Sequence, residues 1–128
     1  FCDRETGVPL ATLDGSALTA LRTPAASALA TDVLARSDVR TLGIFGTGVQ
    51  ARGHIEAVLA VRPGIESVVV CGRTPESSET FAAGVDAGGR TASAASADEV
   101  ATCDVVCGCT SAAEPVIPTA AVRPGTHV

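Results

Sequence analysis

The stretch Arg40-Thr41-Leu42-Gly43-Ile44-Phe45-Gly46-Thr47-Gly48-Val49-Gln50-Ala51 decides the fold of this chain of 128 residues. Residues 40–45 are predicted to form a strand with an apolar second half. Residues 49–61 repeat apolar side chains with helical spacing. The face of this helix that should meet the core carries Ala51, Ile55, Val58 and Leu59. The turn between the two elements has the pattern G-x-G-x-x-A, which in this setting is typical of a dinucleotide-binding loop.

Each position of this loop suits a phosphate group. Gly46 permits the tight turn, and Gly48 lets the backbone approach a pyrophosphate because it has no Cβ atom. Ala51 is small at the point where the helix packs on the strand. The start of the helix offers free N–H groups and a positive dipole end to an anion. The candidate cofactor-binding residues are therefore Gly46, Thr47, Gly48, Val49 and Gln50, and the alternative is a glycine turn that binds nothing.

The second strand of this unit, Val68 to Cys71, indicates which cofactor is bound. A site that prefers NAD(H) has Asp or Glu about 20 residues beyond the glycine loop, where it binds the ribose 2′-hydroxyl. Here Gly72 holds that position, and Arg73 and Thr74 follow. A guanidinium group suits a 2′-phosphate, which it can bind through two hydrogen bonds. We therefore predict that Arg73 and Thr74 favour NADP(H). NAD(H) is the alternative cofactor, and a solvated surface residue is the alternative for Arg73.

Strands and helices continue to alternate outside this unit. Strands are predicted at residues 8–13, 40–45, 68–71, 88–92, 104–109 and 126–128, and helices at 16–21, 23–35, 49–61, 75–83 and 97–102. Thr23 is predicted to cap the second helix, with Pro24 in its first turn. The face of that helix expected to meet the core carries Ala25, Ala28, Leu29 and Val33. The alternation predicts an α/β fold: a doubly wound, parallel-sheet Rossmann dinucleotide-binding domain with a short N-terminal flank of strand and helix.

Composition excludes several other classes of protein. The net charge of −5 argues against nucleic acid or an anionic membrane as a partner. Three aromatic residues are too few for a platform that stacks single-stranded nucleic acid. All nine basic residues are arginine, which excludes Schiff-base chemistry by a lysine of this chain. A chain that opens Phe1-Cys2-Asp3 and has no Met is expected to be a processed or excised piece.

The cysteines are predicted to be buried, reduced thiols of a cytoplasmic protein. Their number is odd, and three of them lie in or beside apolar, strand-like runs. Metal ligation by Cys103, Cys107 and Cys109 is the alternative, but no His or fourth Cys has zinc-site spacing nearby, so no metal site is predicted. No apolar run reaches the ~20 residues that a membrane-spanning helix needs.

Several segments together resemble one family. They are Leu21-Arg22-Thr23-Pro24-Ala25-Ala26-Ser27, Gly46-Thr47-Gly48-Val49-Gln50-Ala51, Cys71-Gly72-Arg73-Thr74, Cys109-Thr110-Ser111 and Pro124-Gly125-Thr126-His127-Val128. They look like the ornithine cyclodeaminase/μ-crystallin family, and the likeness covers essentially the whole chain. It implies a dinucleotide-binding domain at residues 23–128. It also implies that residues 1–22 are a flank of a substrate and dimerisation domain, and that the parent protein is a homodimer.

The resemblance implies roles for five residues. Arg22 matches the arginine that binds the substrate α-carboxylate, and Thr23 matches a residue near the cofactor phosphates. Thr110 and Ser111 match the loop beside the nicotinamide ribose, and His127 lies on the strand that approaches the nicotinamide. Plain structural roles remain the alternatives: a surface salt bridge for Arg22, turn residues for Thr110 and Ser111, and a structural role for His127.

The resemblance also implies limits. Pro24 stands where the family has Ala or Gly, so a backbone contact at this position is not carried over. The family's catalytic lysine and aspartate have no counterpart in this chain. No residue is therefore assigned as catalytic, and the isolated chain is expected to be inactive.

Two functions of different class follow from the resemblance. The first is an NADP(H)-dependent oxidoreductase or lyase that acts on amino acids or cyclic imines, as a ketimine reductase, an amino-acid dehydrogenase or a cyclodeaminase. The alternative is a non-catalytic, μ-crystallin-like protein that binds NADPH and a small ligand. A third candidate, another Rossmann-type oxidoreductase, ranks lower because it would lack the Arg22-Thr23 pair and the segment Gly125-Thr126-His127.

Overall fold

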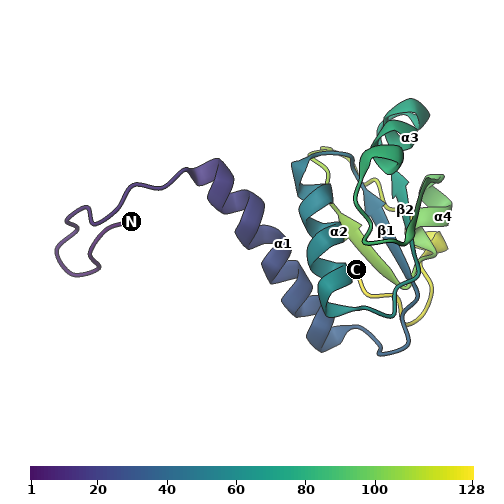
Figure 1. Cartoon of the computed structure of the whole chain (residues 1–128), viewed down its shortest axis with the longest axis horizontal. Coiled ribbons are helices and arrows are strands. Elements are labelled where there is room, and N and C mark those ends of the chain that lie inside the picture. The colour runs from purple at the N-terminus through teal and green to yellow at the C-terminus, as the bar shows by residue number, and fades with distance from the viewer.

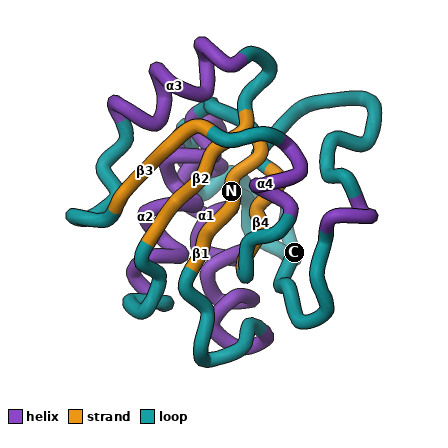
Figure 2. Tube along the Cα trace, turned by 90° about the vertical axis from the view of Figure 1, so that its right-hand side faces the viewer, coloured by secondary structure: helices purple, strands orange, loops and turns teal.

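The computed structural model describes all 128 residues and contains one parallel sheet with helices on both faces (Figures 1 and 2). The elements are α1 (Gly15–Leu34), β1 (Thr41–Phe45), α2 (Val49–Val61), β2 (Ser67–Cys71), α3 (Pro75–Gly84), β3 (Thr91–Ala94), α4 (Ala97–Ala101), β4 (Val105–Gly108) and the 3₁₀ helix η1 (Thr119–Ala121). The strand order is β3-β2-β1-β4, and every pair is parallel. This arrangement confirms the predicted α/β fold.

The core lies on both faces of β1, because the order of strands places β1 between β2 and β4. On one face, Leu42 and Ile44 pack with the buried side of α2, and this cluster also includes Phe81 of α3. On the other face, Phe45 packs with Val100 of α4. The predicted inward face of the helix 49–61 is confirmed, since Ala51, Ile55, Val58 and Leu59 are all buried.

Helix α1 corrects the prediction of two separate helices at 16–21 and 23–35. It is a single helix that Asp14 caps by accepting hydrogen bonds from the amides of its first turn. Thr23 is therefore in the helix interior and caps nothing. Pro24 lies inside the helix, and its ring packs closely on α2: a Cβ atom at Gly53 would lie 2.6 Å from Cγ of Pro24 and 3.4 Å from the carbonyl oxygen of Ala20. The proposed domain boundary between residues 22 and 23 falls within this helix.

The side of α1 that packs on α2 also differs from the prediction. Of the four residues expected in the core, only Ala28 is buried, while Leu29 and Val33 are 66% and 70% exposed. The contact with α2 is partly polar, because Nε2 of the buried His54 lies 2.9 Å from Oγ of Ser27. The other ring nitrogen of His54, Nδ1, lies 2.7 Å from the Gln50 carbonyl oxygen. His54 therefore packs between α1 and α2 with both ring nitrogens in polar contacts.

Three predicted strands are wrong or displaced. Residues 8–13 form no strand, and the only pairing in this exposed arm is a bridge between Cys2 and Pro9. The strand expected at 88–92 begins at Thr91 instead, because Gly88 and Gly89 adopt positive φ angles of 60° and 80° in a turn. Residues 126–128 reach the sheet through a single parallel bridge between Val105 and His127.

Candidate functional site

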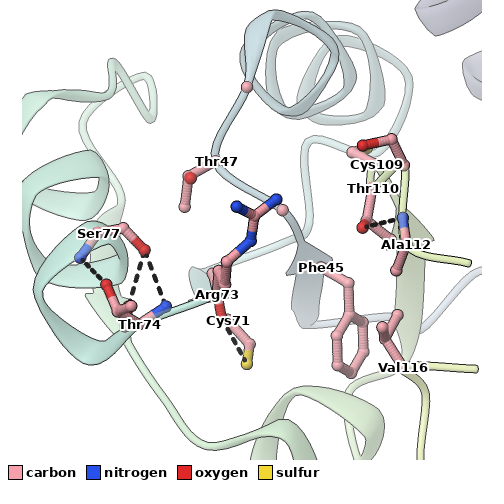
Figure 3. Close-up of a pocket in the computed structure, with 14 residues that line it drawn as sticks. Phe45, Thr47, Cys71, Arg73, Thr74, Ser77, Cys109, Thr110, Ala112 and Val116 are labelled. Carbon is pink, nitrogen blue, oxygen red and sulfur yellow. Dashed lines mark hydrogen bonds between the residues drawn. The ribbon is translucent and has the colours of Figure 1, made fainter. Parts of the chain in front are cut away.

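A cavity of about 660 Å³ opens at the carboxyl edge of the sheet (Figure 3). Three loops form its wall: the turn after β1, the turn from β2 into α3, and the segment after β4. The lining residues are Phe45, Gly46, Thr47, Gly48, Cys71, Gly72, Arg73, Thr74, Ser77, Cys109, Thr110, Ser111, Ala112 and Val116. This edge is where ligands of open parallel α/β sheets bind.

The two glycines of the loop after β1 have different structural roles. Gly46 has a φ angle of +110°, and a Cβ atom there would overlap the Cys109 carbonyl group. Its N–H donates to the Cys71 carbonyl oxygen at 2.8 Å, so the turn is held tightly between β2 and β4. Gly48 is exposed, and a Cβ atom there would meet nothing within 4 Å. Gly46 therefore shapes the loop, while Gly48 leaves an open approach to its backbone.

The start of α2 is the one helix start facing this cavity that no side chain caps. Gly48 provides no side-chain hydrogen bond, and the first turn holds no acidic residue. The amides of Val49 and Gln50 donate to no acceptor in the chain. By contrast, side chains cap α1, α3 and α4 through Asp14, Thr74 and Ser96. Free amides and a positive helix end fit an anionic group, so the residues present match the pyrophosphate of a dinucleotide.

The turn from β2 into α3 carries the positive charge of Arg73. Its first residue, Gly72, is tightly packed by neighbouring side chains. A Cβ atom at Gly72 would lie 2.6 Å from Oγ of Ser77 and 2.8 Å from Cγ2 of Thr47. Arg73 is exposed and forms no ion pair, and no acidic residue lines the cavity. Thr74 belongs to a capping box in which its side chain accepts a hydrogen bond from the Ser77 amide at 3.2 Å. In Figure 3 the Arg73 guanidinium group extends toward the glycine loop.

The cavity brings together seven of the twelve residues that the sequence singled out: Gly46, Thr47, Gly48, Arg73, Thr74, Thr110 and Ser111. Arg22, Thr23, Val49, Gln50 and His127 do not line it. The Gln50 side chain points to α1 instead, where its Nε2 donates to the Thr19 carbonyl at 3.2 Å. His127 pairs its backbone with β4, and Arg22 is exposed on α1.

Sequence reasoning missed other residues of the cavity wall, namely Phe45, Cys71, Ser77, Cys109, Ala112 and Val116. The sequence held a signal for three of these residues. Phe45, Cys71 and Cys109 each lie at or just after the carboxyl end of a strand. Ser77 lies one turn into α3, and Ala112 and Val116 lie in an irregular segment, so no sequence pattern marked them.

The parallel sheet, the glycine loop and the cavity at the carboxyl edge define a Rossmann-type nucleotide-binding domain. The family model "Ornithine cyclodeaminase/mu-crystallin family" matches residues 1–128. The chain belongs to this family, as its sequence motifs indicated. No helix combines the length and the apolar character needed to cross a membrane.

Three comparisons support this membership. A Delta(1)-pyrroline-2-carboxylate reductase of Paracoccus denitrificans is 39% identical over 130 residues, which cover 98% of this chain and 40% of that protein. The ketimine reductase mu-crystallin of Mus musculus is 36% identical over 98% of this chain and 40% of its own length. The structure of the Thermococcus litoralis Delta(1)-pyrroline-2-carboxylate reductase with NADH and L-proline has a TM-score of 0.87 and 40% identity, over 98% of this chain and 40% of that chain. This chain thus spans about two fifths of the length of these relatives.

Proposed function

We propose that this chain is the NADP(H)-binding domain of an ornithine cyclodeaminase-like oxidoreductase or lyase. The observation that carries the proposal is the cavity at the carboxyl edge, which the uncapped start of α2 and the unpaired Arg73 both face. The similarity to a reductase solved with NADH and L-proline supports a nicotinamide cofactor and a small amino-acid or cyclic-imine substrate. Ketimine reductase, amino-acid dehydrogenase and cyclodeaminase are the three reactions within this proposal.

In the proposed complex, three parts of the cavity bind different parts of the dinucleotide. The backbone from Gly46 to Gln50 binds the pyrophosphate through free amides at the start of α2, with Thr47 and Val49 in the same stretch. Arg73 and Thr74 bind the 2′-phosphate of the adenosine ribose. Thr110 and Ser111 lie after β4 and face the ribose of the nicotinamide. The roles of Thr23 beside the phosphates and His127 near the nicotinamide rest on the family resemblance.

Three features support NADP(H) over NAD(H). The cavity has one cationic side chain and no acidic one. Gly72 occupies the position of the carboxylate that binds a ribose 2′-hydroxyl, and the contacts of Thr47 and Ser77 leave no room for a side chain there. The Arg73 guanidinium group has no ion-pair partner within the chain, so binding a phosphate would break no existing ion pair.

A bound nicotinamide cofactor supplies hydride transfer, and the protein supplies binding and orientation. In this proposal Arg22 holds the substrate α-carboxylate through its planar guanidinium group. The chain has no lysine, no acidic group lines the cavity, and the resemblance assigns no catalytic residue to it. We therefore propose that the isolated chain binds the cofactor and does not turn over amino acids or imines. By the same resemblance we propose a cytoplasmic, homodimeric whole protein.

Calorimetric titration of this chain with NADPH and with NADH tests the proposal. Tighter binding of NADPH supports it, and binding of neither dinucleotide overturns it. Incubation of the pure chain with NADPH and a cyclic imine should give no loss of NADPH absorbance.

A further inference from the structure

The Thr47 side chain extends from the glycine loop to the end of β2. A Cβ atom added at Gly72 would lie 2.8 Å from Cγ2 of Thr47 and 2.6 Å from Oγ of Ser77, both closer than a real Cβ atom approaches its neighbours. The methyl group of Thr47 therefore fills part of the space that a side chain at position 72 would need. That position is where NAD-preferring sites have the carboxylate that binds the ribose 2′-hydroxyl.

The Thr47 hydroxyl is free to donate a hydrogen bond. Its oxygen has no partner within the chain and is not enclosed, and the half-buried residue lines the cavity. The serine hydroxyls around position 72 are already used, because Ser77 and Ser78 both donate to the Thr74 carbonyl oxygen, at 2.8 and 3.0 Å. Thr47 thus has an unused hydroxyl proton at this end of the cavity.

This hydroxyl lies near the cation of the cavity. Arg73 directly follows Gly72, the residue that the Thr47 methyl group crowds. In Figure 3 the Arg73 guanidinium group extends toward the glycine loop, on which Thr47 lies. A phosphate accepts hydrogen bonds from several donors, and bonds to a charged acceptor are stronger than bonds to a neutral one. A hydroxyl beside a guanidinium group therefore favours a ligand with a phosphate over a ligand with a plain ribose hydroxyl.

We propose that Thr47 is a specificity-determining residue of the cofactor site, with separate roles for its methyl group and its hydroxyl. The methyl group leaves no room at position 72 for a carboxylate that would bind a ribose 2′-hydroxyl. The hydroxyl donates a hydrogen bond to the 2′-phosphate that Arg73 binds. Both roles rest on the proposed dinucleotide site.

Two substitutions separate the hydroxyl from the methyl group. Thr47→Val replaces the hydroxyl with a methyl group and keeps the branched shape, while Thr47→Ser keeps the hydroxyl and removes the methyl group. Thr47→Val should weaken NADPH binding about tenfold and NADH binding less than about twofold, because it loses a hydrogen bond to a charged group. Thr47→Ser should keep the parent's preference for NADPH. Calorimetric titration with both dinucleotides measures these affinities.

Thr47→Ala allows a second comparison, because it differs from Thr47→Ser by the hydroxyl oxygen alone. Thr47→Ala should bind NADPH about tenfold more weakly than Thr47→Ser, and NADH about equally. This pair tests the hydroxyl without the added methyl group of Thr47→Val.

Gly72→Asp tests the role of the methyl group. The loss of Tm that this substitution causes should be smaller by about 2 °C or more in the Thr47→Ser background than in the parent, because the two side chains contact each other. The double variant should also bind NADH at least about threefold more tightly than Gly72→Asp alone. Thr47→Ser combined with Gly84→Ala is the control, since a Cβ atom at Gly84 meets nothing within 4 Å and the two Tm changes should add.

Equal weakening of both dinucleotides in Thr47→Val, or of neither, would overturn the role of the hydroxyl. Additive Tm changes and an unchanged NADH affinity in the double variant of Thr47 and Gly72 would overturn the role of the methyl group. Either result leaves the proposed function intact when the parent chain binds NADPH more tightly than NADH. Binding of neither dinucleotide to the parent chain would overturn the proposed function, and both roles of Thr47 with it.

Discussion

A Cβ atom added to Gly72 would lie 2.8 Å from Cγ2 of Thr47, so the glycine loop crowds the end of β2 at the position where NAD-preferring sites have a carboxylate. The Gly72 N–H is also occupied, since it donates to Oγ of Ser78 at 2.7 Å. The next residue, Arg73, is free of ion pairs. The two positions together explain why we propose NADP(H): one excludes a carboxylate, and the other offers a cation.

The contact between Gly72 and Thr47 predicts that position 72 accepts no side chain. Gly72→Ala should lower stability by about 1–3 kcal/mol, as overpacking of a filled space does. Gly72→Asp should lower stability at least as much as Gly72→Ala. It should gain no affinity for NADH, because the space at position 72 does not fit a carboxylate side chain. Gly84→Ala is the matched control: a Cβ atom there meets nothing within 4 Å, so this change should leave the Tm equal or higher. An Asp at position 72 that binds NADH tightly without loss of Tm would contradict this account.

Arg73 should determine the choice of cofactor. Arg73→Ala should weaken NADPH binding by about 1.5–3 kcal/mol, the usual range for a hydrogen bond to a charged group, and leave NADH binding nearly unchanged. Arg73→Asp should reverse the preference toward NADH. Arg123→Ala removes another exposed arginine, outside the cavity, and should change neither affinity. If Arg73→Ala weakens both cofactors equally or neither, Arg73 does not bind a 2′-phosphate.

The two loop glycines should respond differently to alanine. Gly46→Ala should lower the stability of the fold by about 1–3 kcal/mol, because of its positive φ angle and its contact with Cys109. Gly48→Ala should keep the Tm of the parent chain, because the added carbon atom meets open space. It should nevertheless weaken dinucleotide binding by placing a methyl group where the pyrophosphate approaches. Thermal melts and calorimetry on both variants check this difference, and equal Tm values for the two variants would refute it.

Asp104 should make stability depend on pH. Burial would raise the pKa of this carboxyl group, but hydrogen bonds from the Arg40 amide and from the hydroxyl and amide of Thr41, with the charge of Arg36, outweigh it and lower the pKa below 3.8. A carboxylate with a lowered pKa in the folded state stabilises the fold fully above its unfolded pKa. That contribution is lost as pH falls through the folded value.

Asp104→Asn should therefore destabilise the chain at pH 7, and the difference from the parent should shrink below about pH 4, the ordinary range of an aspartate pKa. Urea unfolding at several pH values measures it. Glu56→Gln removes a carboxylate at an exposed position on α2 that forms no ion pair, and serves as the control. A constant difference between Asp104→Asn and the parent from pH 7 to pH 3 would contradict the role of the Asp104 charge.

The central unit of the fold could be predicted closely from sequence. Helix α2 has the predicted bounds, and β2 and α3 each differ by one residue at one end, because strong local signals mark them: the glycine turn, the β-branched run before Cys71, and Thr74-Pro75. Strand β4 is one residue shorter than predicted at each end. The start of α1 was predicted within one residue, at residue 16, but its continuity through Thr23-Pro24 was not. Thr23-Pro24 is a typical helix start, yet the helix runs through it, with the Pro24 ring packed against Gly53 of α2.

The candidate site could be predicted in part, for a reason of geometry. Arg73 and Thr110 follow strands, and the carboxyl ends of parallel strands meet at one edge, so both face the cavity. Gln50 has the correct place in the motif, but its side chain turns to the Thr19 carbonyl of α1. Which way a helical side chain points depends on the neighbouring helix, and the position of α1 was not predictable from local pattern.

The most direct test of the account is the affinity of this chain for NADPH and for NADH, measured by calorimetry in the same buffer. The account predicts tighter binding of NADPH, and loss of that difference in Arg73→Ala. Equal affinities, or a preference for NADH, would contradict it.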